Sequence, residues 1–228
     1  MVHGVINIRK EKGFTSHDVV AKLRGILGQK KIGHTGTLDP DATGVLPVCL
    51  GKATKLCDML TDKDKTYETV LLLGKATDTQ DISGTVLSEK AMDGIDNDAV
   101  ERCIGEFVGE YLQVPPMYSA LKVNGKKLYE LARAGIEVER KARPVVIYEI
   151  RIKDISLPRV RMEVSCSKGT YIRTLCHDIG EKLGCGGCME ELTRTKVSRF
   201  TLEDSYTLEE VRQKKEEGTL SEILVPID

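Results

Sequence analysis

Apolar residues along the chain recur with two different periods. Between residues 19 and 27 they return every three to four positions, Thr15 or Ser16 can cap the segment and Gly28 can end it, which predicts a helix. Similar spacing predicts further helices at residues 52–60, 97–108, 128–134 and 172–183 and another that begins after Thr207. Alternation and apolar runs predict strands at residues 5–8, 67–73, 145–155 and 160–166, with a further apolar run at residues 45–50.

The order of these elements predicts the fold class. The strands slightly outnumber the helices and do not alternate with them regularly, which favours an α+β fold with a largely antiparallel sheet over a doubly wound parallel one. Asn124 and Gly125 form a turn signal ahead of the helix at residues 128–134. Because no internal repeat, low-complexity tract or linker interrupts residues 1–228, we expect one continuous domain.

The average charge conceals three basic stretches. The 228 residues carry 34 basic and 35 acidic side chains, a net charge of −1 that would argue against a nucleic-acid partner. However, residues 1–39 and 122–143 each carry seven basic and three acidic side chains, and residues 159–199 carry eight and five. Residues 75–110 and 203–228 are acidic instead. The basic runs are either solvated faces or parts of one face that could bind a polyanion.

Several classes of protein and site are not expected. No apolar run is long enough to cross a bilayer and residues 1–13 lack the apolar core of a secretory signal, so we expect a cytoplasmic chain without membrane contact. An odd count of seven cysteines fits reduced thiols. Cys185 and Cys188 have the spacing of half a zinc site, but no second such pair exists, so we expect no metal. Residues 44–52 lack the spacing of a phosphate-binding loop.

The densest group of polar side chains lies in residues 33–46. This segment contains His34, Asp39 and Asp41 together with three glycines and Pro40. Glycine and proline favour a loop of defined shape, and Pro40 pushes Asp39 toward an extended conformation that can aim its carboxylate outward. The alternative is an Asp-Pro turn with a capping role.

Two other segments carry candidate side chains. Tyr171 and Arg173 are two residues apart at a predicted strand-to-helix junction, so on an extended stretch they would share a face. Arg173 could then clamp a carboxylate and Tyr171 could back a flat ring. The alternative is a surface arginine at a helix start, where the helix dipole disfavours positive charge. Tyr67, at the start of a predicted strand, is a weaker candidate because strand tyrosines are usually packing residues.

Together these segments resemble the TruB family of tRNA pseudouridine synthases, from Gly4 to about Asp228. Six segments match in order: GHTGTLDPDATGVLPVCLGKATK at 33–55, DKTYE at 64–68, GKATDTQDISG at 74–84, PPMYSALKVNGKKLYELARAG at 115–135, CSKGTYIRTL at 166–175 and ELTRTKVSRF at 191–200. The resemblance implies a pseudouridine synthase fold, in which helices flank a mixed, mainly antiparallel central sheet.

The resemblance also implies a role for each matched residue. Asp39 would be the catalytic aspartate that attacks the nucleoside, Arg173 would pair with it and keep it ionised, and Tyr67 would stack on the uracil and take part in proton transfer. The implied substrate-binding residues are His34, Tyr171 and Leu192. No metal or other cofactor is implied.

The implied reaction is the isomerisation of uridine 55 in the T loop of tRNA, with the base flipped out of the RNA. We expect a monomer that binds the T arm and needs no guide RNA. In contrast to the family pattern, Cys188 replaces a common histidine, and residues 10–13 read Lys-Glu-Lys-Gly where Lys-Pro-x-Gly is usual. The family's C-terminal PUA-type domain is expected to be absent or truncated. Two alternatives stay open, an RNA chaperone that folds tRNA and a guide-RNA-dependent synthase.

Overall fold

The computed structural model describes residues 1–226, which fall into two compact units. The first unit comprises Met1–Glu68 and Leu192–Asp228, and the second comprises Thr69–Glu191. Strands β4 (Lys65–Leu73) and β12 (Gly187–Val197) each have one end in either unit. The single domain expected over residues 1–228 stays a prediction, and its last two residues, 227–228, lie outside the described residues.

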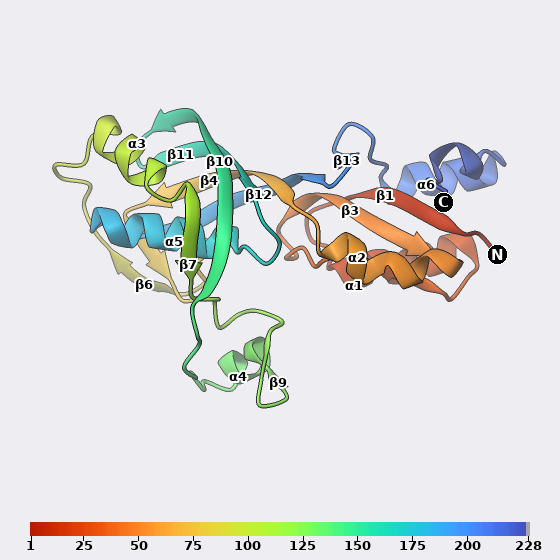
Figure 1. Cartoon of the computed structure of the whole chain (residues 1–228), viewed down its shortest axis with the longest axis horizontal. Coiled ribbons are helices and arrows are strands. Elements are labelled where there is room, and N and C mark those ends of the chain that lie inside the picture. The colour runs from red at the N-terminus through yellow and green to blue at the C-terminus, as the bar shows by residue number, and fades with distance from the viewer. Residues whose placement is uncertain (227–228) are drawn as a thin grey trace. The chain divides into compact units, whose positions relative to one another are not determined.

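The first unit is a small sheet with helices (Figure 1). Its elements are β1 (Gly4–Lys10), α1 (Ser16–Leu27), β2 (Ile32–His34), β3 (Thr43–Leu50), the 3-10 helix η1 (Gly51–Leu56), α2 (Cys57–Thr61), β13 (Phe200–Thr201), α6 (Leu208–Glu216) and the 3-10 helix η2 (Leu220–Ile223). Strand β3 pairs antiparallel with β1 and β2, and in parallel with β12, where Thr43 lies opposite Thr193. Strand β3 is therefore the central strand of this unit.

Helix α1 begins and ends where the sequence predicts. The Thr15 hydroxyl accepts a hydrogen bond from the Asp18 amide at 3.0 Å and the Asp18 carboxylate accepts one from the Thr15 amide at 2.8 Å, while Gly28 ends the helix at a φ of 64°. The apolar face of α1 packs against β1 and β3. The fully or largely buried side chains of this core are Ile6, Ile8, Val19, Val20, Leu23, Leu27, Ile32, Leu46, Val48, Leu50, Val211 and Ile223.

The second unit has a larger sheet and three helices. Its elements are β5 (Lys75–Thr77), β6 (Val86–Glu89), α3 (Asn97–Gly105), β7 (Gly109–Gln113), β8 (Lys122–Val123), β9 (Lys126–Lys127), α4 (Leu128–Arg133), β10 (Arg143–Ser156), β11 (Arg159–Cys166) and α5 (Ile172–Leu183). The strand order is β12-β4-β11-β10-β7, and β10 pairs antiparallel with both β11 and β7. Helix α5 packs close to β12 through Gly180, where an added Cβ would lie 2.1 Å from the Gly187 amide nitrogen.

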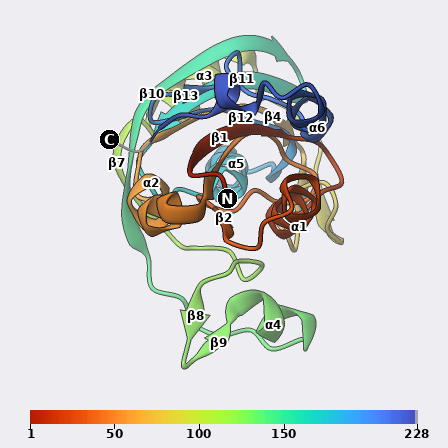
Figure 2. The ribbon, with the colours of Figure 1, turned by 90° about the vertical axis from the view of Figure 1, so that its right-hand side faces the viewer.

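The turn expected at Asn124 and Gly125 joins β8 to β9. Both residues have positive φ, 50° and 81°, as a two-residue hairpin turn with matching twist requires. This hairpin and α4 lie apart from the strands of the second unit's sheet in both views (Figures 1 and 2). Residues 122–133 therefore form a small basic projection of the second unit.

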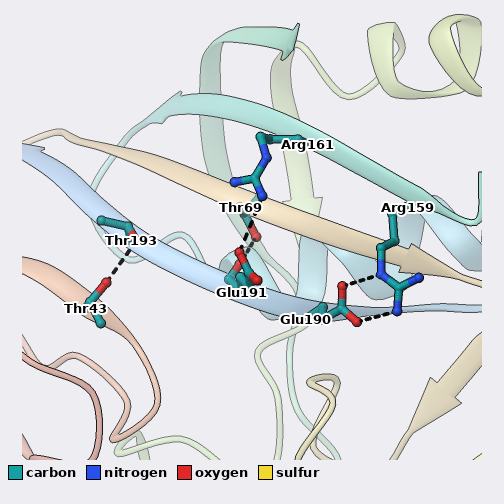
Figure 3. Close-up of polar contacts among 7 residues, drawn as sticks. All are labelled: Thr43, Thr69, Arg159, Arg161, Glu190, Glu191 and Thr193. Atoms are coloured by element: carbon teal, nitrogen blue, oxygen red, sulfur yellow. Dashed lines mark hydrogen bonds and ion pairs between the residues drawn. The ribbon is translucent and has the colours of Figure 1, made fainter. Parts of the chain in front are cut away.

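Charged side chains connect β11 and β12 across the intervening strand β4 of the second unit's sheet (Figure 3). Arg159 of β11 forms a bidentate pair with Glu190 of β12, with hydrogen bonds of 2.8 and 2.9 Å. Arg161 lies 3.6 Å from Glu191, whose carbonyl oxygen accepts a hydrogen bond from the Thr69 hydroxyl at 2.7 Å. Because the arginines are about half exposed, we assign these pairs to strand alignment more than to stability.

The predicted fold class is confirmed, since the chain is α+β and its sheet is mixed and mainly antiparallel. Two helix predictions are wrong in detail. Residues 52–60 do not form one helix, because the 3-10 helix η1 is followed by the five-residue α2. Helix α3 is capped by Asp96, whose carboxylate accepts a hydrogen bond from the Ala99 amide, and it ends at Gly105 instead of residue 108.

We expect opposite stability effects from alanine at two helical glycines. Gly180→Ala should lower the free energy of unfolding by about 1–3 kcal/mol, because its Cβ would collide with backbone atoms of β12. Gly25→Ala, the control on α1, should raise it by about 0.5–1 kcal/mol, because nothing lies within 4 Å of the added Cβ. Urea unfolding of both variants measures the difference, and equal effects would show that α5 does not pack as described.

Candidate active site

Asp39 lies in the loop between β2 and β3, residues 35–42, which we call the Asp39 loop. The Thr35 amide and hydroxyl both donate to the Pro47 carbonyl oxygen, at 3.1 and 3.0 Å. The Leu38 amide donates to the Ser16 hydroxyl at 3.0 Å. Both side chains are buried, Thr35 at 0% exposure and Leu38 at 3%. The loop therefore enters the core immediately before Asp39, which is half-buried.

Backbone hydrogen bonds also fix the turn that follows Asp39. The Asp39 carbonyl oxygen accepts from the Ala42 amide at 3.0 Å, and the Pro40 carbonyl oxygen accepts from the Gly13 amide at 2.8 Å. The Asp-Pro turn that the sequence allowed is therefore present, and it belongs to a loop whose shape is defined by contacts on both sides. The turn at Asp39 and Pro40 is compatible with a fixed position for the Asp39 carboxylate.

Lys10 is a buried cation beneath this turn. Its side chain is 1% exposed, and its ammonium group donates to three backbone oxygens, those of Glu11 (3.1 Å), Phe14 (2.6 Å) and Pro40 (3.1 Å). Burial lowers the pKa of Lys10 to about 8, although the nearby carboxylates of Asp39 and Asp41 act to raise it. Lys10 therefore connects β1 to the Asp39 loop by hydrogen bonds and by charge.

Arg194 binds the Asp39 loop near its start and the strand β3 that follows the loop. This side chain is 1% exposed, its Nε donates to the Val45 carbonyl oxygen at 2.8 Å and its Nη2 donates to the Gly36 carbonyl oxygen at 3.3 Å. The backbone of β12 also approaches Gly44 closely, since a Cβ there would lie 2.2 Å from the Arg194 carbonyl oxygen. Gly44 has a φ of 111°, so any other residue would be strained as well as crowded.

His34 ends β2 and leads into the Asp39 loop. Its ring packs edge-on against His17, with the ring centroids 5.2 Å apart. Burial lowers the pKa of His34 below its usual value, and the neighbouring His17 and Arg194 add to this effect. The imidazole is therefore neutral at neutral pH. Its predicted role in substrate binding stays a prediction.

Tyr67 and Leu192 also belong to the first unit. Tyr67 lies in β4 and is 7% exposed, and Leu192 lies in β12 and is half-buried. Beside them the Thr195 hydroxyl donates to the Thr66 carbonyl oxygen at 3.2 Å, and the hydroxyls of Thr43 and Thr193 share a hydrogen bond of 2.9 Å (Figure 3). Four predicted residues, His34, Asp39, Tyr67 and Leu192, are thus carried by one unit.

Arg173 lies in the first turn of α5, in the second unit. It is 6% exposed, and its Nη1 and Nη2 donate to the carbonyl oxygens of Thr79 and Tyr118 at 3.1 and 2.9 Å. The alternative of a surface arginine is therefore wrong. The shared face expected for Tyr171 and Arg173 on an extended stretch is also wrong, because Tyr171 is the N-cap and Arg173 is already helical.

The sequence did not single out three residues that support these side chains. Lys10 and Arg194 bind carbonyl oxygens of the Asp39 loop, and Gln113 binds the backbone of Tyr171. Lys10 gave one readable signal, a charge at the end of an apolar, alternating strand. The pairing of Asp39 with Arg173, which lie in different units, and the roles assigned to all six residues stay predictions.

No group of three or more His, Cys, Asp or Glu residues among residues 1–226 is arranged to hold a metal ion. Cys185 and Cys188 are buried thiols, and burial raises the pKa of Cys188 to about 11, so it is protonated at neutral pH. Within the same described range no helix combines the length and the apolar character needed to span a membrane.

Residues 24–172 match the TruB family pseudouridylate synthase N-terminal domain, and residues 173–228 match the tRNA pseudouridylate synthase B C-terminal domain. A relative named tRNA pseudouridine synthase B from Lachnoclostridium phytofermentans is 59% identical, over all of this chain and 76% of its own length. The enzyme of the same name from Streptococcus pneumoniae is 51% identical, over all of this chain and 80% of its length.

Two solved structures resemble the fold over 98% of this chain. A chain in the crystal structure of a Cbf5–Nop10–Gar1 complex matches with a TM-score of 0.78 and 34% identity, and this chain covers 60% of it. A chain in an H/ACA RNP bound to a substrate RNA containing 2′-deoxyuridine matches with a TM-score of 0.74 and 31% identity, and this chain covers 59% of it. The chain thus spans about three fifths of these solved proteins.

We expect Lys10→Met to destabilise the chain by about 1–3 kcal/mol, because it removes the donor shared by three carbonyl oxygens around the Asp39 loop. Lys12→Met is the matched control, since Lys12 is exposed on the same segment and its loss should change the free energy of unfolding by less than about 0.5 kcal/mol. Urea unfolding at pH 7 compares the two, and similar values would contradict the role of Lys10.

The pKa of Lys10 also predicts how stability depends on pH. Its pKa is about 8 in the folded chain against a usual 10.5, so between these values the unfolded chain binds more protons. The contribution of Lys10 to the free energy of unfolding therefore rises with pH across this window. Unfolding at pH 8 and pH 10 should show wild type gaining stability relative to Lys10→Met, and a relative loss would contradict the lowered pKa.

Proposed function

The chain belongs to the TruB family of pseudouridylate synthases, and we propose that it isomerises uridine 55 in the T loop of tRNA to pseudouridine. The observation that carries this proposal is the Asp39 loop, because a half-buried carboxylate is presented on a turn whose backbone is held by Lys10 and Arg194. A nucleophile needs such a fixed position relative to its target atom. The relatives named tRNA pseudouridine synthase B support tRNA as the substrate.

The reaction exchanges one bond of the uracil for another. The N1–C1′ bond breaks, the base turns, and C1′ rejoins the base through C5. The proton of C5 leaves to solvent and N1 takes up one proton, so the product is an isomer and no electrons are gained or lost. We propose that Asp39 is the nucleophile that carries the nucleoside between these states. No cofactor is needed to balance this change.

The remaining predicted residues take supporting roles in the proposal. Arg173 would pair with Asp39 and keep it ionised and oriented. Tyr67 would stack on the uracil and take part in proton transfer, and Tyr171 and Leu192 would line the pocket wall. His34 would contact the part of the RNA loop from which the base is flipped. A uridine in a folded loop must be extruded before its glycosidic bond is accessible, at a cost of a few kcal/mol.

The RNA would bind to the basic stretches at residues 1–39 and 122–143. The second stretch contains the β8–β9 hairpin and α4, which project from the sheet of the second unit (Figure 2). Phosphate contacts of this kind position the RNA, while the site reads the flipped base. We propose that both units act as one catalytic domain, as a cytoplasmic monomer that requires no guide RNA.

Asp39→Asn should abolish turnover and leave RNA affinity within a few-fold, because the amide is not nucleophilic but has nearly the same shape. Asp41→Asn is the control in the same loop, and since Asp41 is exposed it should keep most of the activity. Release of tritium from tRNA labelled at uridine C5 measures turnover, and filter binding measures affinity.

Each outcome of this experiment is informative. Substantial tritium release by Asp39→Asn would exclude Asp39 as the nucleophile. Wild type that binds tRNA without release would favour the RNA chaperone. Release that begins only after a guide RNA is added would favour the guide-dependent alternative.

A further inference from the structure

Gln113, the last residue of β7, holds the backbone of Tyr171 from 58 positions away. Its side-chain Oε1 accepts a hydrogen bond from the Tyr171 amide at 2.8 Å, and its Nε2 donates to the Tyr171 carbonyl oxygen at 3.0 Å. Gln113 is 2% exposed, so these bonds are made away from solvent, where a missing partner is costly. The amide thus acts as a two-point clamp on one residue.

The neighbours of Gln113 fix which way the amide points. Its Nε2 also donates to the Tyr111 hydroxyl at 2.9 Å, and that hydroxyl donates to the Asp178 carboxylate at 2.7 Å. Both amide hydrogens are therefore used, and a flipped amide would place its oxygen against the Tyr171 carbonyl oxygen. The chain of bonds begins and ends on α5, because Tyr171 is the N-cap of that helix and Asp178 lies inside it.

The clamp replaces a cap that the helix lacks. Tyr171 makes no side-chain capping bond, since a tyrosine ring cannot reach back to the first amides of the helix. Gln113 instead fixes the peptide groups on both sides of Tyr171. Five residues later, the Tyr118 carbonyl oxygen accepts a hydrogen bond from Arg173. The segment from Gln113 to Tyr118 therefore fixes the backbone of Tyr171 and the guanidinium of Arg173 together.

We propose that Gln113 is a positioning residue for the isomerisation. By setting the start of α5 it sets where the Tyr171 ring and the Arg173 guanidinium are presented to the nucleoside. The inference rests on the proposed function of these two residues. Loss of the clamp should lower the rate of the chemical step more than RNA binding, because a misplacement of about 1 Å near the reacting atoms costs up to about 100-fold in rate.

Gln113→Met tests this, since methionine has a similar length and can make neither bond to Tyr171. We expect kcat for tritium release from labelled tRNA to fall about 10-fold to 100-fold, while KM and the Kd for tRNA stay within about three-fold. Leu112→Ala is the control on the same strand, because Leu112 is 65% exposed, and it should keep the wild-type kcat. Tyr111→Phe keeps both bonds to Tyr171 and should lose less than Gln113→Met.

The outcomes separate the two proposals. No tritium release by wild type overturns the proposed function, whereas an active wild type with unchanged kcat in Gln113→Met overturns the role of Gln113. Equal increases of KM and Kd with kcat retained would also overturn it, because they indicate a purely structural effect on RNA binding. If Gln113→Met is unfolded at the assay temperature, Gln113→Asn, whose amide is one methylene shorter, gives the same kcat test.

Discussion

Two buried cations determine the shape of the loop that carries Asp39. Most of this loop makes no strand ladder, so its carbonyl oxygens need other donors, and Lys10 and Arg194 supply them. A buried cation is itself costly unless its N–H groups are bonded, so the loop and the cations each satisfy the other. Their charges also extend to the groups around them, since Arg194 helps to lower the pKa of His34, and Asp39 acts on the pKa of Lys10. Lys10 and Arg194 therefore hold the loop in shape and are also part of the electrostatic interactions around it.

The sequence predicted the elements whose signals are local. Helix α1 followed from its cap, its apolar spacing and Gly28, and the β8–β9 turn followed from Asn124-Gly125. Strand β12 was missed because its sequence mixes charged and apolar residues without strict alternation, which reflects a strand that passes between different neighbours. Residues 52–60 were misjudged because an apolar spacing cannot distinguish a 3-10 turn followed by a short helix from one continuous helix.

The residue types and their order in the sequence identified the candidate site residues. The residues that hold these candidates in place could not be found in this way. Arg173 was expected to serve a carboxylate, which stays a prediction. The structure shows two of its N–H groups bound to the carbonyl oxygens of Thr79 and Tyr118, more than 50 positions away. Gln113 carries no local signal of importance, because a glutamine at the end of a strand is usually solvated. Only the fold brings its amide to Tyr171. Hydrogen bonds between such side chains and backbone groups far away in the sequence cannot be predicted from the spacing of residues in a motif.

The first unit is assembled from both ends of the chain, which has a consequence for the order of events during synthesis. Thr43 and its partner Thr193 are 150 positions apart, and at about 5–20 residues per second the ribosome needs roughly 8–30 s to make the intervening segment. The nascent chain therefore contains Asp39, Tyr67 and Arg173 before it contains Arg194. Until Arg194 emerges, the carbonyl oxygens of Gly36 and Val45 lack this donor. The three predicted catalytic side chains are thus made before the support of the Asp39 loop is complete, and the site can mature only after Arg194 has been made.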